Sequence, residues 1–97
     1  MVRVIIERHC KPGKEAQLRN LLIELRTVAT RQHGYISGET LRDLEDPSLF
    51  VIISTWASLQ TWKMWEISAR RLQIEQQLDE LMTAEARLRI CALDYEI

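Results

Sequence analysis

Three tryptophans are the residues of this sequence best suited to hold an aromatic ligand. Trp56, Trp62 and Trp65 lie within ten residues of one another. An indole ring offers a large apolar surface and one N–H donor, so a helix that turns Trp62 and Trp65 toward a sheet would form a stacking wall for a flat ring. The same two side chains would also serve as core between helix and sheet, and the sequence leaves both interpretations open. Trp56 is predicted to be a core residue.

His9 and Glu75 are the candidate general bases. His9 ends the first apolar segment, and an imidazole titrates near neutral pH, although this position is also typical of a surface or pocket-rim residue. Glu75 lies one position from an apolar stripe through Ile74 and Leu78, which predicts a solvated edge. If its carboxylate points into a pocket instead, it would act as a base.

Arg70 and Tyr35 are candidate ligands for a substrate oxygen. The guanidinium of Arg70 would stabilise an anionic oxygen, whereas two adjacent arginines, Arg70 and Arg71, at a helix start are typical of a solvated face. Tyr35 offers a phenol donor, or serves as an amphipathic residue of the sheet or of an interface. No His, Cys or carboxylate cluster has metal-ligand spacing and no Gly-rich phosphate loop is present, so we expect neither metal nor cofactor.

The elements that must position these residues alternate between strand and helix patterns. Met1 to His9 is an apolar, β-branched run that Lys11-Pro12-Gly13 ends, and from Lys14 to Ala29 apolar residues recur every three or four positions, as in a helix. Two helical pieces are predicted next, one behind Ser58 and one after a bend near Ser68. The other predicted strands are Tyr35–Leu41, Leu49–Trp56 and Arg87–Ile97, with a turn over 43–48.

This order predicts an α+β fold of the ferredoxin-like split βαβ type (βαββαβ), with a four-stranded antiparallel sheet and the helices on one face. The strand LFVIIST is apolar on both faces, with Val51 and Ile53 on one and Phe50 and Ile52 on the other. Both faces of such a sheet need cover. We therefore expect a homodimer in which the open faces of two sheets pack together.

Length and composition restrict the class of protein further. The 97 residues suffice for one domain, 1–97, and 46% hydrophobic with 28% charged residues is typical of a globular chain. A net charge of -1 with no basic run argues against a nucleic-acid partner. No apolar stretch approaches the roughly 20 residues of a membrane span, and the N-terminus is unlike a secretory signal. We expect a cytoplasmic protein that does not bind membranes, with Cys10 and Cys91 reduced and unbridged.

The segments VIIERHCKPGKEAQLRNLL and HGYISGETLRDLEDPSLFVIISTWASLQ resemble the antibiotic biosynthesis monooxygenase (ABM) family over nearly all of the chain. The resemblance depends on Lys-Pro-Gly-Lys after the first strand, on Arg42-Asp43 with Glu45-Asp46-Pro47, and on Trp56 at a strand end. It implies a dimeric α+β barrel with a pocket between the helices and the sheet of each protomer. It also implies oxygenation of quinols or polycyclic phenols without metal or flavin.

The resemblance leaves three functions open. Family members typically carry histidines at the positions of Trp65 and Arg70, and a haem-degrading branch of the superfamily carries tryptophan at position 65 and its iron ligand at the position of Glu75. The first function is a cofactor-independent monooxygenase of a small hydroxylated aromatic such as a quinol. The alternatives are a non-catalytic dimeric module that binds a small ligand for regulation, and a haem-binding or haem-degrading protein. Whether the chain is an enzyme stays open at this level.

Overall fold

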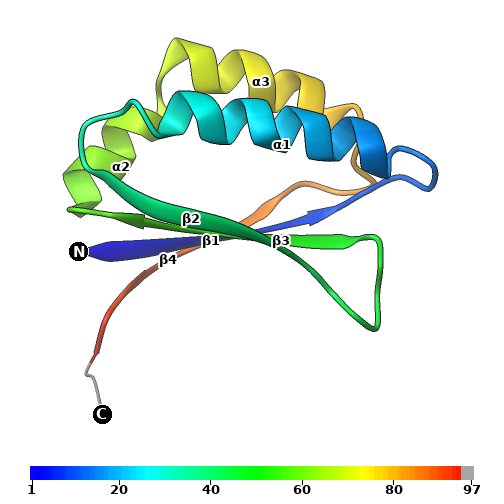
Figure 1. The fold of residues 1–97 in the computed structure, drawn as a ribbon, viewed down its shortest axis with the longest axis horizontal. Coiled ribbons are helices and arrows are strands. Elements are labelled where there is room, and N and C mark those ends of the chain that lie inside the picture. The colour runs from blue at the N-terminus through cyan, green and yellow to red at the C-terminus, as the bar shows by residue number, and fades with distance from the viewer. Residues whose placement is uncertain (95–97) are drawn as a thin grey trace.

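The fold consists of four strands and three helices in the computed structural model, which describes residues 1–94 (Figure 1). The predicted order of strands and helices, and the ferredoxin-like α+β class, are confirmed. The elements are β1 (Val2–His9), α1 (Glu15–Ala29), β2 (Tyr35–Arg42), β3 (Leu49–Trp56), α2 (Leu59–Glu66), α3 (Ala69–Asp79) and β4 (Arg87–Ala92).

The four strands form one antiparallel sheet in the order β2-β3-β1-β4. Val4 lies opposite Ser54 on β3 and Ile90 on β4, which gives the register of the two pairings that β1 makes. All three helices cover one face of this sheet, as predicted, and in the described part of the chain the other face is open (Figure 1). Ile5 and Ile53 are paired on this open face, where each is half-buried.

The core lies between the helices and the sheet. Side chains alternate along β1, so Val4, Ile6 and Arg8 point toward the helices and are buried while their neighbours are not. On α1 the apolar residues face the sheet at helical spacing. The buried apolar side chains are Val4, Ile6, Cys10, Leu18, Leu22, Ala29, Phe50, Trp56, Trp62, Trp65, Ile74, Leu78 and Met82.

Local hydrogen bonds fix the start of both short helices. The Ser58 hydroxyl accepts from the Thr61 amide at 3.2 Å and the Thr61 hydroxyl accepts from the Ser58 amide at 3.2 Å, which makes a reciprocal cap for α2. Ser68 caps α3 in the same way by accepting from the Arg71 amide, so the predicted break near Ser68 is confirmed. Gly34, at φ +88°, turns the chain under Thr61 and leaves no room there for a Cβ.

Four element boundaries differ from the sequence prediction. β1 and α1 each begin one residue later, at Val2 and Glu15, and β2 continues one residue further, to Arg42. The last strand was predicted over Arg87–Ile97 but ends at Ala92, and the remainder of that prediction, 95–97, lies outside the described residues. Of the helices in the described residues, none combines the length and the hydropathy of a membrane span.

Candidate functional site

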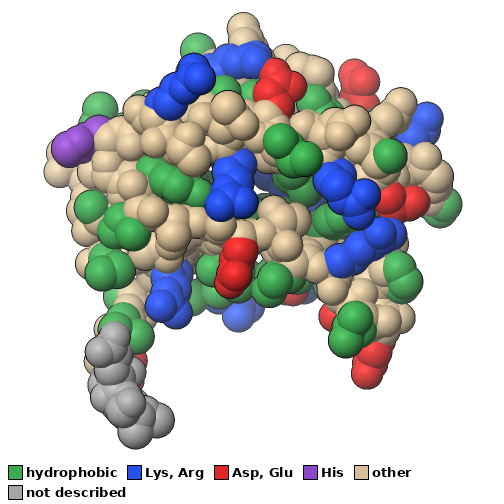
Figure 2. Space-filling view, in the orientation of Figure 1, with side chains coloured by type: hydrophobic (Ala, Val, Ile, Leu, Met, Phe, Trp, Pro, Cys, Tyr) green, Lys and Arg blue, Asp and Glu red, His purple; other side chains and the backbone are tan. Residues whose placement is uncertain are grey.

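A cavity of about 60 Å³ lies between the three helices and the covered face of the sheet. This is several times the roughly 10–15 Å³ that one water needs but well under the ~150 Å³ of a cavity that binds benzene, so a bound aromatic ring would extend toward the surface opening of the cavity. Its aromatic lining comes from β2, β3 and α2, and its charged lining residues are Arg8, Arg26, Glu39 and Arg71. The cavity reaches the surface between α1 and β2, where Arg26 and Glu39 are exposed. Basic side chains lie along this boundary on the face that Figure 2 shows.

Four aromatic rings form one wall of the cavity, built around Trp56. Trp65 stacks on Trp56 with ring centroids 6.3 Å apart, whereas Trp62 and Tyr35 meet it edge-on at 5.8 and 5.4 Å. Trp62 and Trp65 are three residues apart on α2, so both face the sheet. Only 1% of Trp62 and 4% of Trp65 is exposed, and both line the cavity. The two residues are therefore core and cavity wall at once.

Three buried polar atoms around this cavity have no hydrogen-bond partner within residues 1–94: Tyr35 Oη, Trp62 Nε1 and Arg8 Nε. All three belong to lining residues. A buried donor without a partner costs about 1–3 kcal/mol, and native proteins tolerate few of them. Gly38 makes space for the tyrosine, because a Cβ at this position would lie 2.5 Å from Tyr35 Oη. The wall of the cavity thus contains free donors that no described residue satisfies.

A buried ion cluster adjoins the aromatic wall and contributes Arg8 and Arg71 to the cavity lining. Arg8, which is 1% exposed, donates to both oxygens of Glu75, through Nη1 at 3.0 Å and Nη2 at 2.5 Å. Arg71 Nη2 lies 3.3 Å from the same carboxylate, and its Nη1 donates to the Glu66 carbonyl at 3.1 Å. The Arg71 guanidinium lies 5.3 Å from the centre of the Trp62 ring. Burial lowers the pKa of Arg71, and the charge of Arg8 adds to this, while the Glu75 carboxylate opposes it.

The structure brings three of the predicted site residues together and leaves three outside the cavity lining. Tyr35, Trp62 and Trp65 line the cavity. Glu75 lies behind the arginines, 17% exposed, with both oxygens bound by Arg8. Arg70 is exposed on α3 and pairs with the Glu24 carboxylate on α1.

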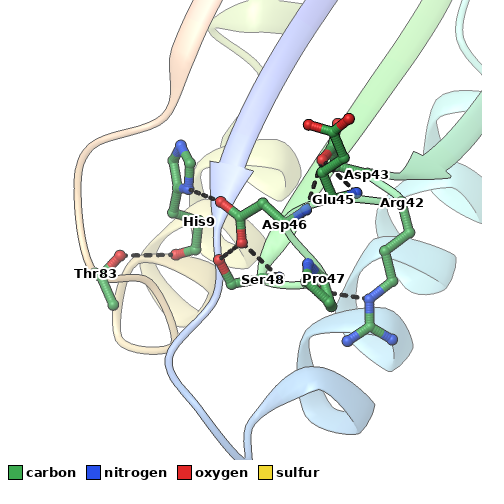
Figure 3. Close-up of polar contacts among 8 residues, drawn as sticks. All are labelled: His9, Arg42, Asp43, Glu45, Asp46, Pro47, Ser48 and Thr83. Atoms are coloured by element: carbon green, nitrogen blue, oxygen red, sulfur yellow. Dashed lines mark hydrogen bonds and ion pairs between the residues drawn. The ribbon is translucent and has the colours of Figure 1, made fainter.

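His9 lies on the opposite side of β1 from the cavity, because its neighbour Arg8 points toward the helices. Its Nδ1 is 3.9 Å from Asp46 Oδ2 in the loop between β2 and β3, and its carbonyl accepts from Thr83 (Figure 3). In this loop the Ser48 hydroxyl and amide bind the Asp46 carboxylate and hold its pKa below the usual 3.8. Within residues 1–94 no group of three His, Cys, Asp or Glu side chains is placed to hold a metal ion.

Arg8 and Arg71 are the buried charged residues of the cavity lining that the sequence interpretation missed. A simple signal was present for each. Arg8 continues the alternation of Val4 and Ile6 on the buried face of β1. Arg71 lies three residues before Ile74, on the buried stripe of α3, whereas the residue selected, Arg70, lies on the exposed side.

Comparisons with known proteins place the fold in a described family. A family model described as "Antibiotic biosynthesis monooxygenase" matches residues 1–77. Among curated proteins there is no match.

Several solved structures share the fold at low sequence identity. A conserved protein from Methanosarcina mazei Go1 has a TM-score of 0.88 at 22% identity, with 93% of this chain and 89% of that chain covered. Rv0793 from Mycobacterium tuberculosis has a TM-score of 0.88 at 22% identity, covering 98% and 96%. SnoaB, described as a cofactor-independent oxygenase from Streptomyces nogalater, has a TM-score of 0.86 at 16% identity, covering 99% and 96%. At such identities the likeness shows the fold.

Proposed function

The chain belongs to the antibiotic biosynthesis monooxygenase family, and on this premise we propose that it oxygenates a small hydroxylated aromatic substrate, such as a quinol, without metal or flavin. The observation that supports this most directly is the cavity in which an aromatic wall adjoins two buried arginines. The description of SnoaB as a cofactor-independent oxygenase agrees with such chemistry.

The aromatic wall binds and orients the substrate ring. A flat ring that packs against Trp62 and Trp65 gains apolar burial plus about 0.5–1.5 kcal/mol for each favourable ring pair. Tyr35 Oη and Trp62 Nε1 are free to donate to its oxygens. The same apolar enclosure excludes water from the reacting carbon.

The arginines stabilise the anion that reacts with oxygen. A phenol that ionises beside Arg8 and Arg71 becomes electron-rich and passes one electron to O2, and the two radicals then combine to form a C–O bond. The resulting hydroperoxide loses water: one oxygen atom stays in a new carbonyl, the other leaves as water, and the substrate carbon gives up its hydrogen. The positive charge is fixed before reaction, so it favours both the phenolate and the peroxide without reorganisation.

Glu75 acts as a positioning residue in this scheme. Its two oxygens are occupied by Arg8 at 3.0 and 2.5 Å, so it orients the guanidinium groups. The phenol proton leaves through the opening between α1 and β2. His9 lies outside the cavity lining within the described residues and has no part in the step.

A second copy of the chain is proposed to cover the open sheet face. Ile5, Val51 and Ile53 lie half-buried at its centre, and charged Arg3 lies toward its edge. Pairing two such faces would remove this apolar surface from water. Sedimentation at micromolar concentration should give a dimer, and Val51→Asp should give a monomer. A wild-type monomer throughout would contradict this assembly.

Oxygen uptake tests the proposed activity. The chelator-treated protein is mixed with a panel of quinols and anthrones in an oxygen electrode, beside Trp65→Ala and the matched variant Trp65→Phe. Uptake should be saturable and insensitive to chelator, at least about tenfold slower in Trp65→Ala, and largely retained in Trp65→Phe because the ring remains. Circular dichroism checks that both variants fold. Background uptake with every compound would contradict the proposal and favour a module that binds ligands without chemistry.

A further inference from the structure

The described residues, 1–94, do not neutralise all of the positive charge in the cavity. Three of its four charged lining residues are arginines, Arg8, Arg26 and Arg71. The fourth, Glu39, is exposed on the edge strand β2 and is paired with Ile53, whose side chain lies on the open face of the sheet. Strand alternation therefore directs the Glu39 carboxylate away from the cavity.

The excess of positive over negative charge is clearest in the buried cluster formed by Arg8, Arg71 and Glu75. Arg8 and Arg71 are 1% and 8% exposed, and one carboxylate, Glu75, serves both. The next acidic side chain near Arg71 is Glu66, which pairs with Lys63 at 3.3 Å. Among residues 1–94, one of these positive charges is left without a counter-ion. Such a charge away from water is strongly unfavourable unless an anion joins it.

The free donors indicate the shape of this anion. Arg8 Nε and Trp62 Nε1 are buried, lack partners within residues 1–94, and belong to cavity residues. A carboxylate is planar, carries one negative charge and accepts up to four hydrogen bonds, so it matches both the single excess charge and the planar guanidinium groups. A neutral phenol would accept a hydrogen bond from one of these donors but would leave the excess positive charge of the two arginines without a counter-ion.

We propose that the cavity selects a hydroxylated aromatic acid, whose carboxylate is bound by Arg8 and Arg71 while its ring packs against Trp62 and Trp65. The inference that the ring carries a hydroxyl depends on the proposed oxygenase function. The inference that it carries a carboxylate depends only on the arrangement of charges and donors in the cavity, so the two groups are tested separately.

Calorimetry with a matched pair of ligands tests the carboxylate. The probes are 1-hydroxy-2-naphthoate and its neutral analogue 1-hydroxy-2-naphthamide, which share ring and hydroxyl. The wild-type protein should bind the acid at least about tenfold more tightly than the amide. Arg71→Gln should reduce this preference to about threefold or less, whereas Arg70→Gln, at the exposed neighbour outside the cavity, should keep it.

A second variant gives a change of opposite sign. Glu75→Gln removes the internal counter-ion of both arginines, so the acid should bind several-fold more tightly than to wild type while the amide is unaffected. This result does not depend on whether Arg71→Gln folds. Equal affinities of acid and amide in the wild type, or weaker binding of the acid to folded Glu75→Gln, would overturn the proposal.

Oxygen uptake separates this proposal from the proposed function. If the acid is preferred in binding but consumes no oxygen above background, the oxygenase function fails and the acid site stands. If 1-naphthol is oxygenated with the same kcat/KM as the acid, the function stands and the acid site fails.

Discussion

The position of the Tyr35 hydroxyl in the cavity predicts a strong coupling between Tyr35 and Gly38. A Cβ at Gly38 would lie 2.5 Å from Tyr35 Oη, but 3.5 Å from both Tyr35 Cζ and the Ile53 carbonyl oxygen. The two contacts at 3.5 Å are ordinary van der Waals distances. In Gly38→Ala the methyl group therefore collides with the hydroxyl oxygen and with no other nearby atom.

The size of the effect follows from two opposing terms. Forcing an extra methyl into a packed site costs about 1–3 kcal/mol, while replacing Gly within a strand by Ala returns about 0.5–1 kcal/mol. Gly38→Ala should therefore lower the free energy of unfolding by about 1–2 kcal/mol. In a Tyr35→Phe background the collision is absent, so Gly38→Ala should be neutral or stabilising by up to about 1 kcal/mol. Tyr35→Phe alone should be neutral or stabilising by about 1 kcal/mol, because the hydroxyl it removes is buried and has no partner in the described residues.

Urea unfolding of the wild type, the two single variants and the double variant measures this coupling as a double-mutant cycle. We expect an interaction energy of about 2 kcal/mol between the two substitutions. An equal cost of Gly38→Ala with Tyr and with Phe at position 35 would refute this placement of the phenol, and with it the donor assigned to the cavity.

Three further predictions concern stability, assembly and pH. Gly34→Ala should lower the free energy of unfolding, measured in urea, by about 2–4 kcal/mol, because φ is +88° and the new Cβ would collide with the Thr61 side chain. A loss of less than about 1 kcal/mol would contradict this. Cys91 lies on the open sheet face, so its labelling by a thiol reagent should slow as the protein concentration rises and dimers form. Cys10 is buried and its pKa is raised by burial, so it should label slowly at every concentration. A labelling rate of Cys91 that does not depend on protein concentration would count against the dimer. The pKa of Asp46 is lowered on folding, so its contribution to stability is present above pH 3.8 and is lost as the pH falls through the lower folded pKa. The difference in the free energy of unfolding between wild type and Asp46→Asn should therefore shrink as the pH falls through this range. A difference that stays constant with pH would contradict this assignment.

Most of the fold could be predicted because its signals are local. The apolar, β-branched runs of β1 and β3, the leucine spacing of α1 and the caps at Ser58 and Ser68 each depend on residues that are near in sequence. The end of β4 could not be predicted, because Leu93 and Asp94 continue a plausible strand pattern. Nothing local in the sequence indicates that pairing with β1 ends at Ala92, opposite Val2 at the start of that strand.

The candidate site was only partly predictable, because it depends on long-range pairing of charges. Trp62, Trp65 and Tyr35 could be recognised by type, since large aromatic residues in a small domain favour a cavity or core position. The Arg8–Glu75 pair joins residues 67 positions apart, so neither side chain reveals its partner in the sequence. Buried arginines are rare, and Arg71 was therefore expected on a solvated face.

Turnover under ¹⁸O2 tests the central proposal most directly. Chelator-treated protein reacts with an anthrone or a hydroxynaphthoate that supports oxygen uptake, and mass spectrometry follows the label. A monooxygenase that uses the substrate's own electrons should place one ¹⁸O atom in the new carbonyl of the product and release the other as water, at a rate that depends on the protein and falls in Trp65→Ala. A product labelled with both atoms, labelled from solvent water alone, or formed as fast without the protein would contradict this account.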